Sequence, residues 1–73
     1  MDLNQGEVRL IDFQHQRTGS FFTHLFEALF VADGPNREKL AMGFPEEAEA
    51  VRKWQNVSGY AQIIEKAYEE FKH

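Results

Sequence analysis

The segment Ser20–Ala32 is apolar around most of a helical circumference, and this feature limits what the chain can fold into. After Ser20, its polar residues are Thr23, His24 and Glu27. Such a helix must be nearly surrounded by other apolar surface, because only a narrow stripe of it tolerates water. The segment therefore predicts a central helix that neighbouring helices cover.

Residues that begin or end helices predict the boundaries of this helix and the next. Ser20 is a good N-cap, and Gly34 followed by Pro35 suits the end of the helix. Asn36 then has the side chain to cap a short helix over residues 37–42.

Two more helices are predicted in the second half of the chain. Pro45 fits a first helical position, and the apolar residues that follow it form a narrow stripe: Ala48, Val51 and Trp54. Ser58 is a candidate cap for the last helix. The apolar residues of that helix fall at helical spacing: Tyr60, Ile63, Ile64, Ala67, Tyr68 and Phe71.

The N-terminal residues 1–17 show no comparable helical pattern. Residues 8–13 alternate weakly between apolar and polar side chains, which is compatible with a short strand or an extended arm. We therefore predict an all-α fold, a small bundle of three to four helices with an extended N-terminal arm. A single helical domain is predicted over residues 1–73, with residues 1–17 as an arm or partly disordered.

The length of 73 residues and the absence of cysteine limit how this domain can be stabilised. A chain of this size buries only about 60–65% of its unfolded surface, so small folds often need an additional source of stability. Disulfides and thiolate metal sites are excluded without cysteine. Dense packing, to which seven Phe contribute, and oligomerisation are the remaining routes.

The formal net charge of −4 is spread along the chain among interleaved acidic and basic residues. A clustered basic patch, which non-specific nucleic-acid binding requires, is not found. The first residues lack the pattern of a signal peptide, and no apolar run approaches the roughly 20 residues of a membrane span. We expect a cytoplasmic protein that binds neither nucleic acid directly nor a membrane.

Few residues have a pattern typical of catalysis or metal binding. His24 and Glu27 share a helix face at a spacing compatible with metal binding, but no third ligand is apparent, and a solvated face explains them better. His15 has Asp12 or Glu27 as conceivable partners in a general-base pair, yet no free nucleophile accompanies it. We therefore predict no catalytic, cofactor-binding or metal-binding residue and no cofactor.

The aromatic excess of the helix predicted over Ser20–Ala32 has two interpretations, core packing and an interaction surface. Two adjacent apolar stripes offer more surface than short neighbouring helices need to cover. The candidate interface residues are Phe21, Phe22, Leu25, Phe26, Leu29 and Phe30.

The stretch from Gly19 to Asn56 resembles short uncharacterised proteins of bacteriophage and prophage genomes. The residues that carry the resemblance are Phe22, Leu25, Ala32, Asp33, Asn36, Leu40, Phe44, Pro45, Glu46, Glu47 and Trp54. The resemblance implies a host bacterial cytoplasm and a role in acting on the host, and it places no functional residue.

Together these observations favour a non-enzymatic protein–protein interaction module whose partner is a protein or a second copy in a homodimer, and the resemblance implies that it is phage-encoded and host-interacting. Two alternatives remain open. One is an acidic protein that occupies a nucleic-acid-binding partner, which would require an uneven negative surface. The other is a small metal-dependent enzyme built on His24 and Glu27 and completed by oligomerisation.

Overall fold

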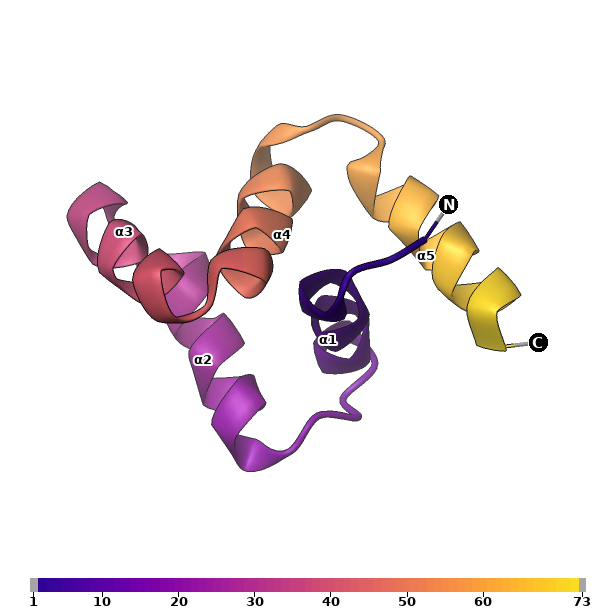
Figure 1. The fold of residues 1–73 in the computed structure, drawn as a ribbon, viewed down its shortest axis with the longest axis horizontal. Coiled ribbons are helices and arrows are strands. Elements are labelled where there is room, and N and C mark those ends of the chain that lie inside the picture. The colour runs from indigo at the N-terminus through magenta and orange to yellow at the C-terminus, as the bar shows by residue number, and fades with distance from the viewer. Residues whose placement is uncertain (1, 73) are drawn as a thin grey trace.

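The chain folds entirely into helices, with the most N-terminal helix at the centre (Figure 1). The computed structural model describes residues 2–72, and the side chains of residues 2–70. Within that range there is no strand, and the elements are α1 (Gln5–Gln14), α2 (Ser20–Val31), α3 (Gly34–Gly43), α4 (Pro45–Asn56) and α5 (Tyr60–Lys72). The all-α prediction is confirmed, but the described residues form five helices where three to four were predicted.

The predicted N-terminal arm is wrong, because its residues form α1. The Asn4 side chain accepts a hydrogen bond from the Glu7 amide at 2.8 Å, and the Glu7 carboxylate accepts one from the Asn4 amide at 3.0 Å. This reciprocal capping box satisfies two amides at the helix start. Leu10 and Ile11 are fully buried, so α1 is part of the core. The weak alternation over residues 8–13 was misleading. The buried residues of α1 follow a helical period, but two of them, Gly6 and Glu7, are not apolar side chains and hide that period in the sequence.

A glycine sets how closely α1 and α4 approach each other. A Cβ atom added to Gly6 would lie 2.3 Å from the carbonyl carbon of Glu46 and 2.6 Å from the amide nitrogen of Glu47. No other residue fits without a shift of one backbone, because both neighbours are main-chain atoms. The close crossing explains why a polar N-terminal segment packs at the centre of the molecule.

Side chains from four helices fill the core. Among the described residues, the largest fully buried side chains are Phe26, Leu10, Ile11, Leu29, Ile64 and Val51. They come from α1, α2, α4 and α5, whereas α3 has no buried residue and packs mainly against α4. α3 is therefore a peripheral helix.

Most helix starts differ by a few residues from those predicted. Gly19, not Ser20, is the N-cap of α2, and it makes no side-chain cap bond. Asp33, not Asn36, caps α3, with its carboxylate accepting from the Asn36 amide at 3.0 Å. The last helix begins at Tyr60, two residues beyond the predicted cap. The prediction that α4 begins at Pro45 is confirmed.

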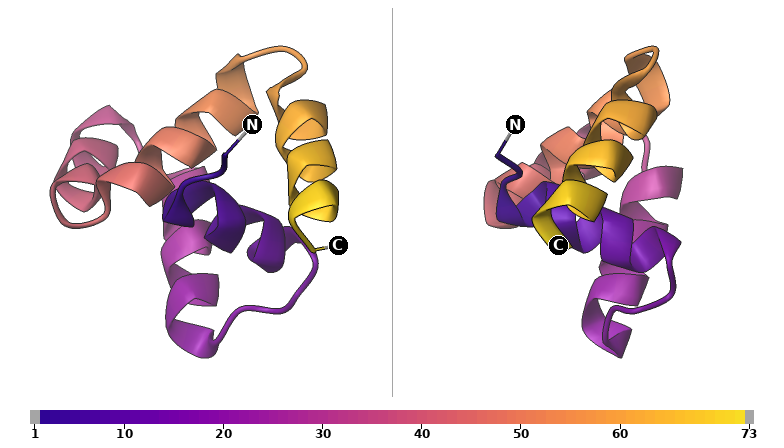
Figure 2. Two further views of the ribbon diagram at one scale, coloured as in Figure 1. Left: turned by 45° about the vertical axis from the view of Figure 1, so that its right-hand side comes forward. Right: turned by 90° about the vertical axis from the view of Figure 1, so that its right-hand side faces the viewer.

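The molecule is flat. Its principal extents are 37 × 27 × 17 Å, and a helix with its side chains is about 10–12 Å across. The shortest dimension is therefore less than two helix diameters, as the turned views in Figure 2 show. In this flat molecule α3 and α5 lie at opposite edges, and the outer side of each helix faces solvent (Figure 1).

We expect Gly6→Ala to destabilise the fold by about 1–3 kcal/mol, because the added methyl group forces α1 away from α4. Gly43→Ala is a matched control, since a Cβ atom there has no neighbour within 4 Å. Urea unfolding followed by circular dichroism measures both. Equal stability of the two variants would contradict the close crossing.

Candidate protein-binding surface

Three phenylalanine rings gather where the first turn of α2 meets the junction of α3 and α4. The Phe21 and Phe22 rings are 5.1 Å apart between centroids in an edge-on arrangement, and Phe44 lies 5.6 Å from Phe21 and 6.4 Å from Phe22. Phe21 is 58% exposed, whereas Phe22 and Phe44 are half-buried. We call these three residues the aromatic patch. In this patch the Phe21 ring faces solvent and packs against the rings of Phe22 and Phe44.

Local backbone geometry brings these rings together. α2 begins at Ser20, so Phe21 and Phe22 lie in its first turn. Phe44 is at once the last cap of α3 and the first cap of α4, with φ −135° and ψ 65°. Because this residue belongs to neither helix, its ring can lean toward α2 instead of following either helix face.

A cation lies against the edge of the aromatic patch. The Arg9 guanidinium sits 4.5 Å from the Phe22 ring centroid and donates a hydrogen bond to the Glu47 carboxylate at 2.6 Å. Glu47 is buried with its side chain only 5% exposed, whereas that of Arg9 is 37% exposed. A buried carboxylate requires a partner, so Arg9 is held in place by the charge beneath it.

The predicted interface residues divide between core and surface. Leu25, Phe26 and Leu29 are buried within the chain itself, and Phe30 is half-buried against Phe13 with ring centroids 6.1 Å apart. Core packing therefore accounts for these four residues. The part of the predicted interface that reaches solvent is Phe21, with Phe22 beside it.

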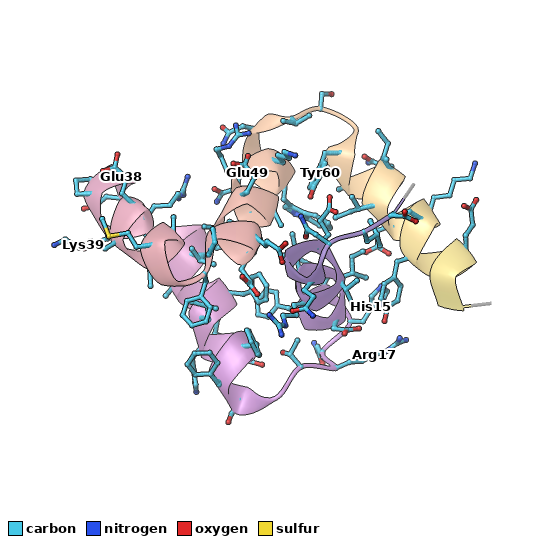
Figure 3. All side chains as sticks on the ribbon, viewed as in Figure 1. His15, Arg17, Glu38, Lys39, Glu49 and Tyr60 are labelled. Carbon is cyan, nitrogen blue, oxygen red and sulfur yellow. The ribbon has the colours of Figure 1, made fainter. Side chains whose placement is uncertain are left out.

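Two shallow depressions flank α3. The first lies between α2 and α3, with the apolar residues Ala28, Val31, Ala32 and Leu40 in its wall. The second lies between α3 and α4 and is lined mainly by small apolar groups with Arg37 and Arg52 at its sides. Glu38 also lines the second depression and Lys39 the first, and Figure 3 labels both on α3. Both depressions are open and mixed in charge, unlike the enclosed pockets that hold small molecules.

Exposed apolar side chains also occur singly. Val31 and Met42 are each 84% exposed, and Ile63 is 55% exposed on α5. Isolated exposed apolar residues are common on soluble domains and need no functional explanation. The aromatic patch differs because its three rings are contiguous.

The residues that sequence reasoning considered for chemistry do not converge on one site. His24 and Glu27 contact each other at 3.3 Å on an exposed face, with side chains 79% and 61% exposed. Among the described residues, no group of three or more His, Asp or Glu side chains is placed to hold a metal ion. Of the conceivable partners of His15, Asp12 accepts a hydrogen bond from Tyr68, and His15 itself contacts Glu65 at 3.2 Å.

Sequence reasoning missed two tyrosine–carboxylate pairs between α1 and α5. The Tyr60 hydroxyl donates to Glu7 at 2.7 Å, and the Tyr68 hydroxyl donates to Asp12 at 2.5 Å. The partners are more than 50 residues apart along the chain, so no local spacing could reveal them. The one available signal was the Asn4–Glu7 capping box, which would have identified α1.

The surroundings of both tyrosines make their hydroxyl groups harder to ionise. Burial raises the pKa of Tyr60, and the hydrogen bond to Glu7 and the negative charges of Glu7 and Glu49 add to this effect. The hydrogen bond to Asp12 raises the pKa of Tyr68, burial adds to it, and Arg17 opposes it. A phenolate beside a carboxylate would place two like charges in contact, which explains the common direction.

Comparison with known proteins assigns no relationship. No protein-family model, curated protein or solved structure matches this chain. None of the helices among residues 2–72 is both long and apolar enough to cross a membrane. The resemblance to phage proteins therefore stays a prediction, and any function must be argued from the surface itself.

We expect the free energy of unfolding to fall as the pH rises above about 10, the ordinary pKa of tyrosine. The unfolded chain then loses phenolic protons that the folded chain still holds, so the folded state binds more protons and rising pH favours unfolding. The stabilisation is complete below pH 10 and is lost at up to about 1.4 kcal/mol per pH unit for each tyrosine. Urea unfolding at pH 8 and pH 11 measures the loss. The double variant Tyr60→Phe/Tyr68→Phe is the control, and an equal loss in that variant would show that other groups cause it.

Proposed function

We propose that this chain is a non-enzymatic interaction module that binds a protein partner through the aromatic patch. The observation that carries the proposal is the exposure of Phe21, 58% open to solvent on a base formed by two other rings. Aromatic side chains are enriched in protein interfaces because they bury a large area at a small cost in conformational entropy. Phe22 and Phe44 hold Phe21 in place, which reduces this cost further.

The partner that best fits the patch is a second copy of the chain. In a two-fold contact each surface meets itself, so the surface must be self-complementary. The sides of the aromatic patch carry opposite charges, Arg9 over Phe22 and the exposed Glu46 two residues after Phe44. A two-fold arrangement can place the cation of one copy opposite the carboxylate of the other while the rings stack at the centre.

The proposed setting is the cytoplasm of a bacterium, as an extension of the resemblance to phage proteins. In that setting the same surface would also serve to contact a host protein. The side chains of the aromatic patch suit such a role, because they pack against one another in the free protein and lose little conformational entropy on binding.

A metal-dependent enzyme has weaker support than an interaction module. His24 and Glu27 point to each other on an open face and form no concave site. The depressions beside α3 contain no close pair of a nucleophile and a base. The alternative of an acidic protein that occupies a nucleic-acid-binding partner has no specific contact in its favour either. Its negative charge is partly neutralised or hydrogen-bonded, since Glu47 and Glu49 pair with arginines and Asp12 accepts from a tyrosine hydroxyl.

Self-association predicts that Phe21→Glu weakens the dimer while the helical content stays the same. The substitution puts a charge at the centre of the proposed contact, and Phe21 contributes little to the core of the monomer. Light scattering over a concentration series measures the mass. We expect a shift of the dimer to at least tenfold higher concentration in the variant.

Val31→Glu is the matched control, because Val31 is an exposed apolar residue near the other end of the same helix. It should leave the mass unchanged. A wild-type monomer throughout the series would contradict self-association. Equal weakening by the two substitutions would show that the contact is not centred on the aromatic patch. Phe26→Glu is unsuitable as a probe, since Phe26 is fully buried and a charge there would unfold the chain.

A further inference from the structure

α5 is attached to the rest of the molecule in an unusually polar way. Among the described side chains, three hydrogen-bonded pairs join it to α1 and the residue that follows: Tyr60 with Glu7, Tyr68 with Asp12 and Glu65 with His15. The His15 and Tyr68 rings also stack, with centroids 6.4 Å apart. We call these six residues the α5 clasp. Figure 3 shows His15 at the end of α1, on the side that faces α5.

The apolar part of this contact centres on one aliphatic side chain, Ile64, with Ala67 and the rings of Tyr60 and Tyr68 buried around it. Of the six largest fully buried side chains among the described residues, Ile64 alone belongs to α5. The other five lie on α1, α2 and α4. Detaching α5 therefore removes Ile64, Ala67 and the two tyrosine rings from the core, and both of these tyrosines belong to polar pairs of the α5 clasp.

The link between α4 and α5 can act as a hinge. It consists of residues 57–59, and Gly59 adopts a φ of +82°, which glycine reaches without a steric penalty. α5 lies at the edge of the flat molecule and contacts only α1 and α4 appreciably (Figures 1 and 2). Its outer face is open, and no other element has to move for the helix to swing away.

We propose that α5 is a strap that opens separately, leaving α1–α4 folded, and that the α5 clasp sets how often it opens. Local openings are governed by the few contacts that each unit makes with the rest of the molecule. Here those contacts include three side-chain pairs with carboxylates, and the loss of one partner weakens a pair directly. Opening uncovers the side of α1 that carries Glu7 and Asp12 and turns a closed edge of the bundle into a free one.

Native-state amide hydrogen exchange by NMR tests the proposal on the intact chain. The amides of Ile64 and Ala67 report on α5, that of Val51 on α4 and that of Leu10 on α1. We expect the two α5 amides to share one opening free energy, lower than that of Val51 and Leu10. Simple fraying from the C-terminus would instead give protection that rises steadily from Ala67 to Ile64.

Tyr68→Phe removes one hydroxyl of the α5 clasp and keeps the ring. We expect the opening constant at Ile64 and Ala67 to rise roughly tenfold, as for loss of a hydrogen bond to a charged acceptor, with Val51 unchanged. Leu29→Ala is the control, because it weakens the core of α2 and should lower the protection of Val51 and Leu10.

Two results would overturn the proposal. Equal opening free energies for α5 and α4 in the wild type, falling together in Tyr68→Phe, would show a single cooperative unit. Less protected α5 amides that do not respond to Tyr68→Phe would show that the α5 clasp does not control the opening.

Discussion

The close crossing of α1 and α4 is the constraint on which the rest of the structure depends. Gly6 lets the two backbones meet, and buried carboxylates flank it on each helix, Glu7 on α1 and Glu47 on α4. Each carboxylate then needs a donor from another part of the chain, and Tyr60 and Arg9 supply these donors. One glycine contact thus determines how α5 attaches and where the cation beside the aromatic patch lies.

The flat shape links this crossing to the proposed interactions. A core built around one short central helix leaves α3 and α5 at the edges, each with an open side (Figure 1). Phe21, Phe22 and Phe44 offer an apolar surface where the start of α2 meets the α3–α4 junction. At the α5 edge, the α5 clasp adds polar pairs to the burial of one helix face. This arrangement suits a small module that binds through one face.

Sequence reasoning succeeded where local signals and the buried pattern agreed. The start at Pro45 and the inward side of Ala48 and Val51 were predicted, because a helix-starting residue and an apolar stripe coincide there. It failed for α1, where Glu7 lies within the buried face and interrupts the apolar period. For the candidate surface, the aromatic helix was identified, but the third ring, Phe44, lies between two helices and has no periodic signal.

The sequence by itself determined that the chain is helical and that the segment Ser20–Ala32 contributes apolar side chains to the core. The central position predicted for that segment is occupied by α1 instead, and Phe21 and Val31 of α2 stay exposed. Only the tertiary structure decided which aromatic residues stay exposed and which acids become buried. Both depend on contacts between distant segments, such as Phe21 with Phe44 and Tyr60 with Glu7. Such contacts follow from the crossing at Gly6, and the spacing of residues along one helix carries no information about it.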